Sequence, residues 1–312
     1  MLFLGMPQLA ADVTSQKILP TATDSQIGET YNLPHTLYVN RDIIVEHSTN
    51  LPPDRHELLL FLPGTNGSGA AGGAGFCALA ANLGYHAISL TYATGISAAE
   101  ACATDRDPKC FENFRLALIE GGASKHLTVS RADSIENRLI KLLGYLNQRR
   151  PKENWSQFLV DDQTLKWDAI AVSGQSQGGG HAALIAIRHR VARAVCLGAP
   201  KDFNKMRDAP AAWYEEPAAT PKALFFTFNH VEDRQGCTPA ELLQNLRALK
   251  LTDFGPAVDA ATSHFPFKHT RILSTTYPAT NKSKVAHGSV VATANAARWE
   301  SVWTYMLTEK AP

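Results

Sequence analysis

The sequence lacks several features that would point to a membrane or nucleic-acid partner. It has no apolar run of the roughly 18 residues that a membrane-spanning helix needs, so we expect no integral membrane association. Its 30 Lys and Arg against 29 Asp and Glu give a formal net charge of only +1. A chain with this charge balance shows no excess of basic residues for binding nucleic acid or an anionic membrane. The partner that we expect is a small, uncharged substrate molecule.

Signatures of metals and cofactors are also missing. No cysteine pair has zinc-ligand spacing, and there is no His-Glu-x-x-His. Residues Gly67 to Gly72, Gly-Ser-Gly-Ala-Ala-Gly, match the glycine pattern of dinucleotide-binding loops. However, they begin several residues after the preceding predicted strand, and no acidic residue closes the next strand. We therefore predict neither a metal nor an organic cofactor.

Two of the five cysteines, Cys102 and Cys110, flank a polar segment, Ala-Thr-Asp-Arg-Asp-Pro-Lys. This segment has no means of its own to keep a fixed shape, so a disulfide that closes it would make sense in an oxidising compartment. The alternative is two unrelated thiols on a surface loop. Residues 1–30 are predicted to be a loose N-terminal segment, and the apolar residues 1–11 suggest the remnant of a signal peptide. Together these features favour a secreted or periplasmic protein.

The remaining residues, 31–312, are predicted to form one α/β domain, because short apolar runs alternate with helical segments. This alternation indicates a mostly parallel, doubly wound central sheet with helices on both faces and ligands at the carboxyl ends of its strands. Residues 93–130 have no clear period and are predicted to be a small insertion near the active site. The predicted strands are 58–62, 86–90, 169–172, 192–197, 223–228 and 271–274. The predicted helices are about 74–83, 135–146 (with Asp133 as its cap and Glu136 as its N3 partner), 182–187, one that opens at 238–241, and about 292–307.

The most informative motif is Gly174-Gln-Ser-Gln-Gly178, which joins the strand 169–172 to an apolar helix. A serine in this turn occupies a strained bend with its hydroxyl exposed, and the two glycines remove Cβ atoms that would collide with backbone. Ser176 is therefore the predicted nucleophile. The backbone N–H of Gln177, at the helix start, is one predicted oxyanion donor, and Thr65 or Asn66 in the loop after strand 58–62 supplies the second.

A serine nucleophile needs a histidine base, and the base needs an acid on its other ring nitrogen. Asp233 follows the strand 223–228 and is the predicted acid, with Glu232 and Asp202 as alternatives. His287 is the predicted base, carried by a flexible turn between the last strand and the last helix, and His264 is the alternative. The resulting chain order of serine, acid and histidine is the order found in α/β-hydrolases.

Aromatic and histidine side chains near the expected carboxyl edge of the sheet predict a largely apolar pocket for short acyl or aromatic esters. The alternative is ordinary loop packing. The predicted pocket residues are Tyr92, His181, Trp213 and His230. The wider aromatic set adds Phe111, Phe114, Phe203 and Tyr214.

Seven segments, from about residue 55 onward, share their pattern with one known group of proteins. They are the loop 62–67, the Cys102/Cys110 insertion, residues 133–139, Trp167-Asp168 before the elbow, the elbow 174–183, residues 228–233 and residues 286–290. Together they resemble the bacterial BPSS1187-like group of the α/β-hydrolase superfamily. In this chain residue 175 is glutamine where many relatives have histidine, and Gly288 replaces a more usual asparagine.

The resemblance implies the α/β-hydrolase fold and a triad of Ser176, Asp233 and His287. The function that follows is a serine hydrolase that cleaves carboxylic esters through an acyl-enzyme. An acyltransferase would use the same triad, and a non-catalytic binding protein could keep the fold, so both stay open as alternatives. The sequence leaves the oligomeric state open.

Overall fold

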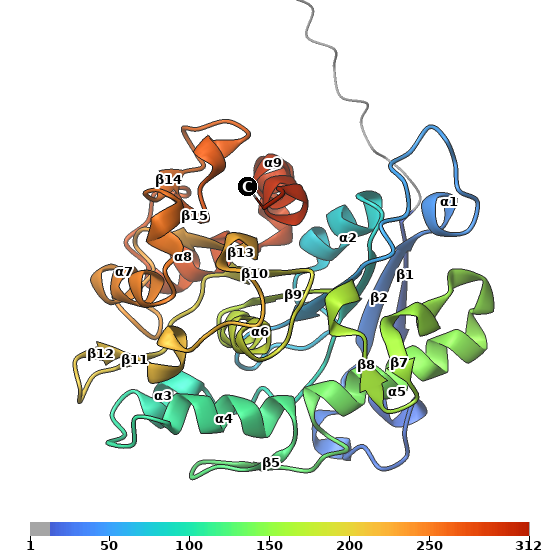
Figure 1. Cartoon of the computed structure of the whole chain (residues 1–312), viewed down its shortest axis with the longest axis horizontal. Coiled ribbons are helices and arrows are strands. Elements are labelled where there is room, and N and C mark those ends of the chain that lie inside the picture. The colour runs from blue at the N-terminus through green and yellow to red at the C-terminus, as the bar shows by residue number, and fades with distance from the viewer. Residues whose placement is uncertain (1–12, 312) are drawn as a thin grey trace, which may run out of the picture.

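The computed structural model describes residues 13–311, and a nine-stranded sheet runs through its centre (Figure 1). The strand order is β1-β2-β4-β3-β9-β10-β13-β15-β14. Strand β2 is antiparallel to both β1 and β4, and every other neighbouring pair is parallel. The bounds are β1 (Val13–Ile18), β2 (His35–Asn40), β3 (Leu58–Leu62), β4 (His86–Ser89), β9 (Ile170–Gln175), β10 (Arg193–Leu197), β13 (Phe225–His230), β14 (Val258–Asp259) and β15 (Ile272–Thr275).

Helices cover both faces of the sheet. Helices α2 and α9 pack on one face, and α4, α5 and α6 pack on the other (Figure 1). The helices are α1 (Arg41–Ile44), α2 (Ala74–Asn82), α3 (Ala98–Cys102), α4 (Cys110–Ile119), α5 (Ile135–Arg149), α6 (Gln177–Arg188), α7 (Pro239–Ala248), α8 (Ser283–Ser289) and α9 (Ala296–Thr308). Three small hairpins lie outside the main sheet: β5 (Gly122–Ala123) with β6 (Thr128–Val129), β7 (Leu159–Asp161) with β8 (Thr164–Leu165), and β11 (Phe203–Asn204) with β12 (Ala209–Pro210).

The central strand β3 shows why the sequence folds in this way. Its five side chains, Leu58 to Leu62, are all completely buried. Leu58, Leu60 and Leu62 belong to the core under α4, α5 and α6, whereas Leu59 and Phe61 belong to the core under α2 and α9. Successive side chains of a strand point to opposite faces, so an unbroken apolar run is what a strand covered on both sides requires. Each such side chain contributes about 1.5–3 kcal/mol by leaving water.

The strand order, the antiparallel second strand and the sharp turn between β9 and α6 make this the α/β-hydrolase fold, as the sequence predicted. The predicted strands at 58–62, 86–90, 169–172, 192–197, 223–228 and 271–274 correspond to β3, β4, β9, β10, β13 and β15. Thr238 and Glu241 form a reciprocal capping box at the start of α7. Among the described residues, no helix combines the length and the apolarity that crossing a bilayer would need.

Two details of the N-terminal half differ from the prediction. Residues 13–30 are not wholly loose, because β1 pairs antiparallel with β2 along its full length and extends the sheet. Residues 1–12, which include the whole predicted signal remnant at residues 1–11, lie outside the described residues. The cap of α5 is Ser134, whose hydroxyl accepts from the N–H of Asn137. Asp133 instead accepts from the N–H of Gly28 and pairs with Arg138.

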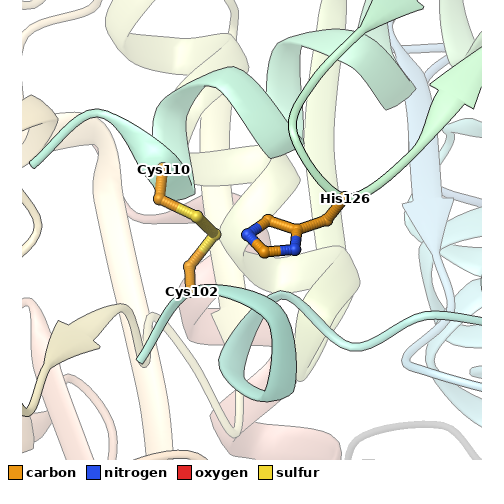
Figure 2. Close-up of side chains that lie close together, drawn as sticks. All are labelled: Cys102, Cys110 and His126. Carbon is orange, nitrogen blue, oxygen red and sulfur yellow. A yellow bond between two sulfur atoms is a disulfide. The ribbon is translucent and has the colours of Figure 1, made fainter. Parts of the chain in front are cut away.

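The insertion at residues 93–130 contains α3, α4 and the β5–β6 hairpin, and a disulfide joins Cys102 to Cys110 (Figure 2). This confirms the predicted pair. The disulfide fixes the end of α3 against the start of α4. His126 points toward it, and the three residues offer ligand atoms within 4.8 Å of one another. Because both sulfurs are bonded to each other, they do not offer a metal the thiolates that cysteine ligation uses.

Candidate active site

Ser176 lies at a strained turn between β9 and α6. Its backbone has φ 56° and ψ −120°, a conformation that non-glycine residues rarely adopt. Its N–H donates to the carbonyl of Leu197, 2.9 Å away on the neighbouring strand. A Cβ atom at Gly178 would overlap the carbonyl of Leu62, and one at Gly174 would overlap the backbone of Gly178. The two glycines therefore permit the turn that places the serine at the carboxyl edge of the sheet.

His287 and Asp233 meet at the same edge. Nδ1 of His287 lies 2.7 Å from Oδ2 of Asp233, and Oδ1 of the same carboxylate accepts from the N–H of Gln235 at 2.9 Å. With Nδ1 committed to the carboxylate, Nε2 is the ring nitrogen left to accept a proton from a serine. Gly198, at φ 59°, leaves room for the ring, since a Cβ there would lie 3.2 Å from the imidazole. The predicted flexible turn is wrong: His287 lies on the short helix α8.

A cavity of about 400 Å³ brings Ser176 and His287 together. It lies between the ends of the central strands, the start of α3 in the insertion, and α8. Its wall is mostly polar and carries charges of both signs. The other residues that line it are Thr65, Asn66, Ser97, Ala98, Ala99, Glu100, Arg115, Gln175, Gln177, Lys201, Asp202, Gln235, Gly236 and Lys284.

Of the three backbone N–H groups predicted to donate to an oxyanion, those of Thr65 and Gln177 remain as candidates. The N–H of Asn66 donates to the carbonyl of Thr94 at 2.9 Å, so it is already occupied and the prediction for Asn66 is wrong. Among the described residues, no acceptor takes the N–H of Thr65 or of Gln177. The Gln177 side chain links the surrounding loops, because its Oε1 accepts from the Thr65 hydroxyl and from the N–H of Ala98. The start of α6 adds the positive end of a helix dipole at this point.

A cation accompanies the Asp233 carboxylate. Nζ of Lys201 lies 2.6 Å from Oδ2, the same oxygen that accepts from His287. Burial by itself would raise the pKa of the Asp233 carboxyl, but the hydrogen bond and charge of His287 and the ammonium of Lys201 lower that pKa overall. Asp233 is therefore held in its ionised form, as a triad acid must be.

The alternative acids and base have other surroundings. Asp202 forms a buried, two-pronged ion pair with Arg115, with Nε 2.6 Å from Oδ2 and Nη2 2.5 Å from Oδ1. Glu232 is partly exposed and pairs with Arg234. His264 is exposed and does not line the cavity. The geometry favours Asp233 and His287 over all three.

The four predicted pocket residues do not line the cavity, and this part of the prediction is wrong. Tyr92, His181, Trp213 and His230 are each at most 2% exposed and lie beneath its wall. Tyr92 donates to the carbonyl of Pro63 and packs edge-on against His181, whose pKa burial and Arg115 hold well below its usual range. Trp213 donates to Asp202 at 3.2 Å, and Nε2 of His230 lies 3.0 Å from the carbonyl of Pro278.

The predicted apolar, aromatic pocket is wrong for the same reason. Phe111, Phe203 and Tyr214 are at most 1% exposed and contribute to the core. Phe114 faces a separate cavity of about 380 Å³, between the insertion and residues 28–31. The aromatic residues near the strand ends stabilise the loops, while polar side chains form the wall next to Ser176.

Sequence reasoning missed two residues beside the site. Lys201 follows β10 at the carboxyl edge of the sheet, so the position argument that was applied to Asp202 applies to it equally. Arg115 lies in the middle of α4, where no sequence pattern indicates its contacts with Asp202 and with the carbonyl of Gln177.

Comparison with known proteins gives structural matches alone. No family model matches the chain, and no curated protein matches its sequence. One similar solved structure is a protein designated a dienelactone hydrolase from Klebsiella pneumoniae, with 10% identity, a TM-score of 0.41, and coverage of 95% of this chain and 98% of that one. Another is S-formylglutathione hydrolase from Staphylococcus aureus, with 10% identity, a TM-score of 0.44, and coverage of 95% and 99%. The fold assignment rests on the strand order and the elbow.

Proposed function

We propose that the protein is a serine hydrolase that cleaves carboxylic esters through an acyl-enzyme. The observation that carries this proposal is the 2.7 Å contact between His287 and Asp233 at the cavity where Ser176 occupies a strained elbow. A nucleophile, a base and an orienting acid, here carried by the β9–α6 turn, helix α8 and the loop after β13, are the groups that acyl transfer needs.

In the proposed reaction the hydroxyl of Ser176 attacks the ester carbonyl while its proton passes to Nε2 of His287. Asp233 stabilises the imidazolium through Nδ1, and the N–H groups of Gln177 and Thr65 donate to the oxyanion. The imidazolium then gives its proton to the leaving alcohol, and an acyl-serine remains. Water, deprotonated by His287, attacks the acyl-serine, and the bond between the acyl carbon and Oγ of Ser176 then breaks to release the acid. The proton on His287 passes to the departing Oγ, which restores the serine hydroxyl and the neutral histidine.

The cavity wall indicates which esters to test first. A volume of about 400 Å³ suits a small molecule, and a wall with Glu100, Arg115, Lys201 and Lys284 suits one with polar groups near the ester. We therefore propose small, soluble, polar esters in place of the aromatic esters that the sequence suggested.

The disulfide also bears on the cellular setting of the protein. A Cys102–Cys110 bond persists in oxidising compartments, which supports a secreted or periplasmic protein. Membership of the BPSS1187-like group stays a prediction from the sequence motifs.

Turnover of a panel of soluble esters by the wild type and by Ser176→Ala tests the proposal. Loss of the nucleophile is expected to lower kcat by about 10⁶-fold, as removal of a triad serine does elsewhere. Equal turnover by both proteins would contradict it. Added alcohol identifies an acyltransferase, because a transesterified product would then replace the free acid.

A further inference from the structure

Lys201 is an unusual neighbour for a catalytic carboxylate. Its side chain is 8% exposed and its partner Asp233 is fully enclosed. Among the residues that the structure describes, Asp233 is the only carboxylate paired with this ammonium, and Nζ itself is buried from solvent. A buried charge without a partner is costly, so the ammonium depends on Asp233.

The same carboxylate oxygen also serves His287. Because Nζ and Nδ1 lie 2.6 Å and 2.7 Å from Oδ2, the two nitrogens are at most 5.3 Å apart, the sum of those distances. During acylation the imidazole gains a proton, and one negative charge then lies between two positive charges. Lys201 therefore acts against the imidazolium while it stabilises the ionised carboxylate.

We propose that Lys201 is a positioning residue of the triad, which fixes the ionised Asp233 carboxylate and opposes the charging of His287, so that catalysis extends to lower pH. This inference rests on the proposed function. A serine hydrolase needs a neutral histidine as its base, so a neighbouring cation that disfavours the imidazolium moves the acid limb of the rate profile downward. At an effective dielectric constant of about 20, two unit charges 5.3 Å apart change a protonation equilibrium by roughly two pH units.

The other charged groups around the pair do not replace this effect. The Arg115 guanidinium is neutralised by Asp202, and the Cys237 thiol is buried, which raises its pKa to about 12 and keeps it neutral. The remaining titratable or charged groups on the packed elements are Lys284 on α8, Glu100 on α3, Glu241 on α7 (paired with Lys205), His230 at the end of β13, and the Glu232–Arg234 pair. In the described part of the chain, none of them forms an ion pair or hydrogen bond with the Asp233 carboxylate.

The pH dependence of kcat/KM for a soluble ester tests the proposal in the wild type, Lys201→Met and Lys201→Arg. Lys201→Met is expected to move the midpoint of the acid limb upward by about one to two pH units. Lys201→Arg, which keeps the charge, is expected to restore most of the wild-type midpoint. Lys205→Met is the matched control, since Lys205 lies in the same segment but pairs with Glu241, away from the triad. An unchanged midpoint in Lys201→Met, even with a lower plateau rate, overturns the proposal and leaves a merely structural lysine.

A readout without turnover separates this inference from the proposed function. The imidazole resonances of His287, followed by NMR as a function of pH, are expected to titrate at higher pH in Lys201→Met than in the wild type. The same shift without ester turnover would support the role of Lys201 and contradict the hydrolase. If Lys201→Met does not fold, as judged by circular dichroism, Lys201→Gln provides the neutral side chain. An identical titration in the wild type and the folded neutral variant refutes the role of Lys201.

Discussion

The buried pair of Arg115 and Asp202 offers a test of how the insertion is held against helix α6. Both side chains are 3% exposed, and two hydrogen bonds of 2.5 and 2.6 Å join them. Nη1 of Arg115 also donates to the carbonyl of Gln177 at 2.9 Å, so α4 is connected to the start of α6. Arg115→Met removes the cation and leaves the carboxylate buried.

The expected loss is large, because a buried pair that loses one partner typically costs about 3–5 kcal/mol. Loss of the hydrogen bond from Arg115 to the Gln177 carbonyl adds about 1 kcal/mol to this cost. We expect Arg115→Met to lower the free energy of unfolding by about 4–6 kcal/mol, measured by urea denaturation at neutral pH with tryptophan fluorescence. The double variant Arg115→Met/Asp202→Asn should lose less than the single variant, because asparagine leaves no buried charge.

Two outcomes would refute this reasoning. A loss below about 1 kcal/mol in Arg115→Met would mean that the pair behaves as an exposed one. A double variant that loses the sum of the two single effects would show that Arg115 and Asp202 do not interact energetically.

Three further predictions concern pH, the disulfide and the elbow. Burial, and then the charge of Arg138, lower the pKa of His35 to about 3. The contribution of His35 to the free energy of unfolding is therefore complete above about pH 6.5 and declines by up to ~1.4 kcal/mol per pH unit as the pH falls toward 3. His35→Asn, which can still accept from the N–H of Thr91, should weaken the pH dependence of the free energy of unfolding, measured by urea denaturation, between about pH 6.5 and 5, and an equal slope in both proteins would contradict this. Cys102→Ser/Cys110→Ser should lower the free energy of unfolding by about 2–3 kcal/mol, with the bond verified by mass spectrometry of an unreduced digest; unchanged stability would mean that the loop is held without it. Gly178→Ala should abolish folding or activity, because the new Cβ would overlap the Leu62 carbonyl. Gly144→Ala on α5, with open space around it, is the control and should be neutral or stabilising. Similar thermal melts and activities for the two variants would count against the elbow geometry.

The sequence was sufficient to predict the elbow and six strands of the central sheet, β3, β4, β9, β10, β13 and β15, because these features depend on local patterns. Strands β2 and β14 were not predicted. A short apolar run such as Leu58 to Leu62 is buried most favourably as a central strand that is covered on both faces. Glycines flank Ser176 because a Cβ at position 174 or 178 would overlap neighbouring backbone. The sequence order also placed Asp233 and His287 after parallel strands at the carboxyl edge, where the structure brings the two side chains into contact. Their roles as acid and base stay predictions.

The wall of the cavity could not be predicted in the same way. Whether a loop side chain faces the cavity or the core depends on how the insertion packs. The residues next to Tyr92 and Trp213 in the sequence show no pattern that predicts their burial. Lys201 pairs with Asp233, 32 positions later in the chain, and Arg115 pairs with Asp202, 87 positions later, so no local pattern indicates either ion pair. Strand β1 was missed because its sequence, Val-Thr-Ser-Gln-Lys-Ile, is largely polar, as an exposed edge strand allows.

Labelling with a fluorophosphonate probe tests the central claim most directly, because the probe reacts with a serine only when a base activates it. Intact mass and peptide mapping should show one adduct on Ser176 in the wild type and none in Ser176→Ala, with strongly slowed labelling in His287→Ala. A wild-type protein that stays unlabelled, or an adduct on a serine other than Ser176, would contradict the account.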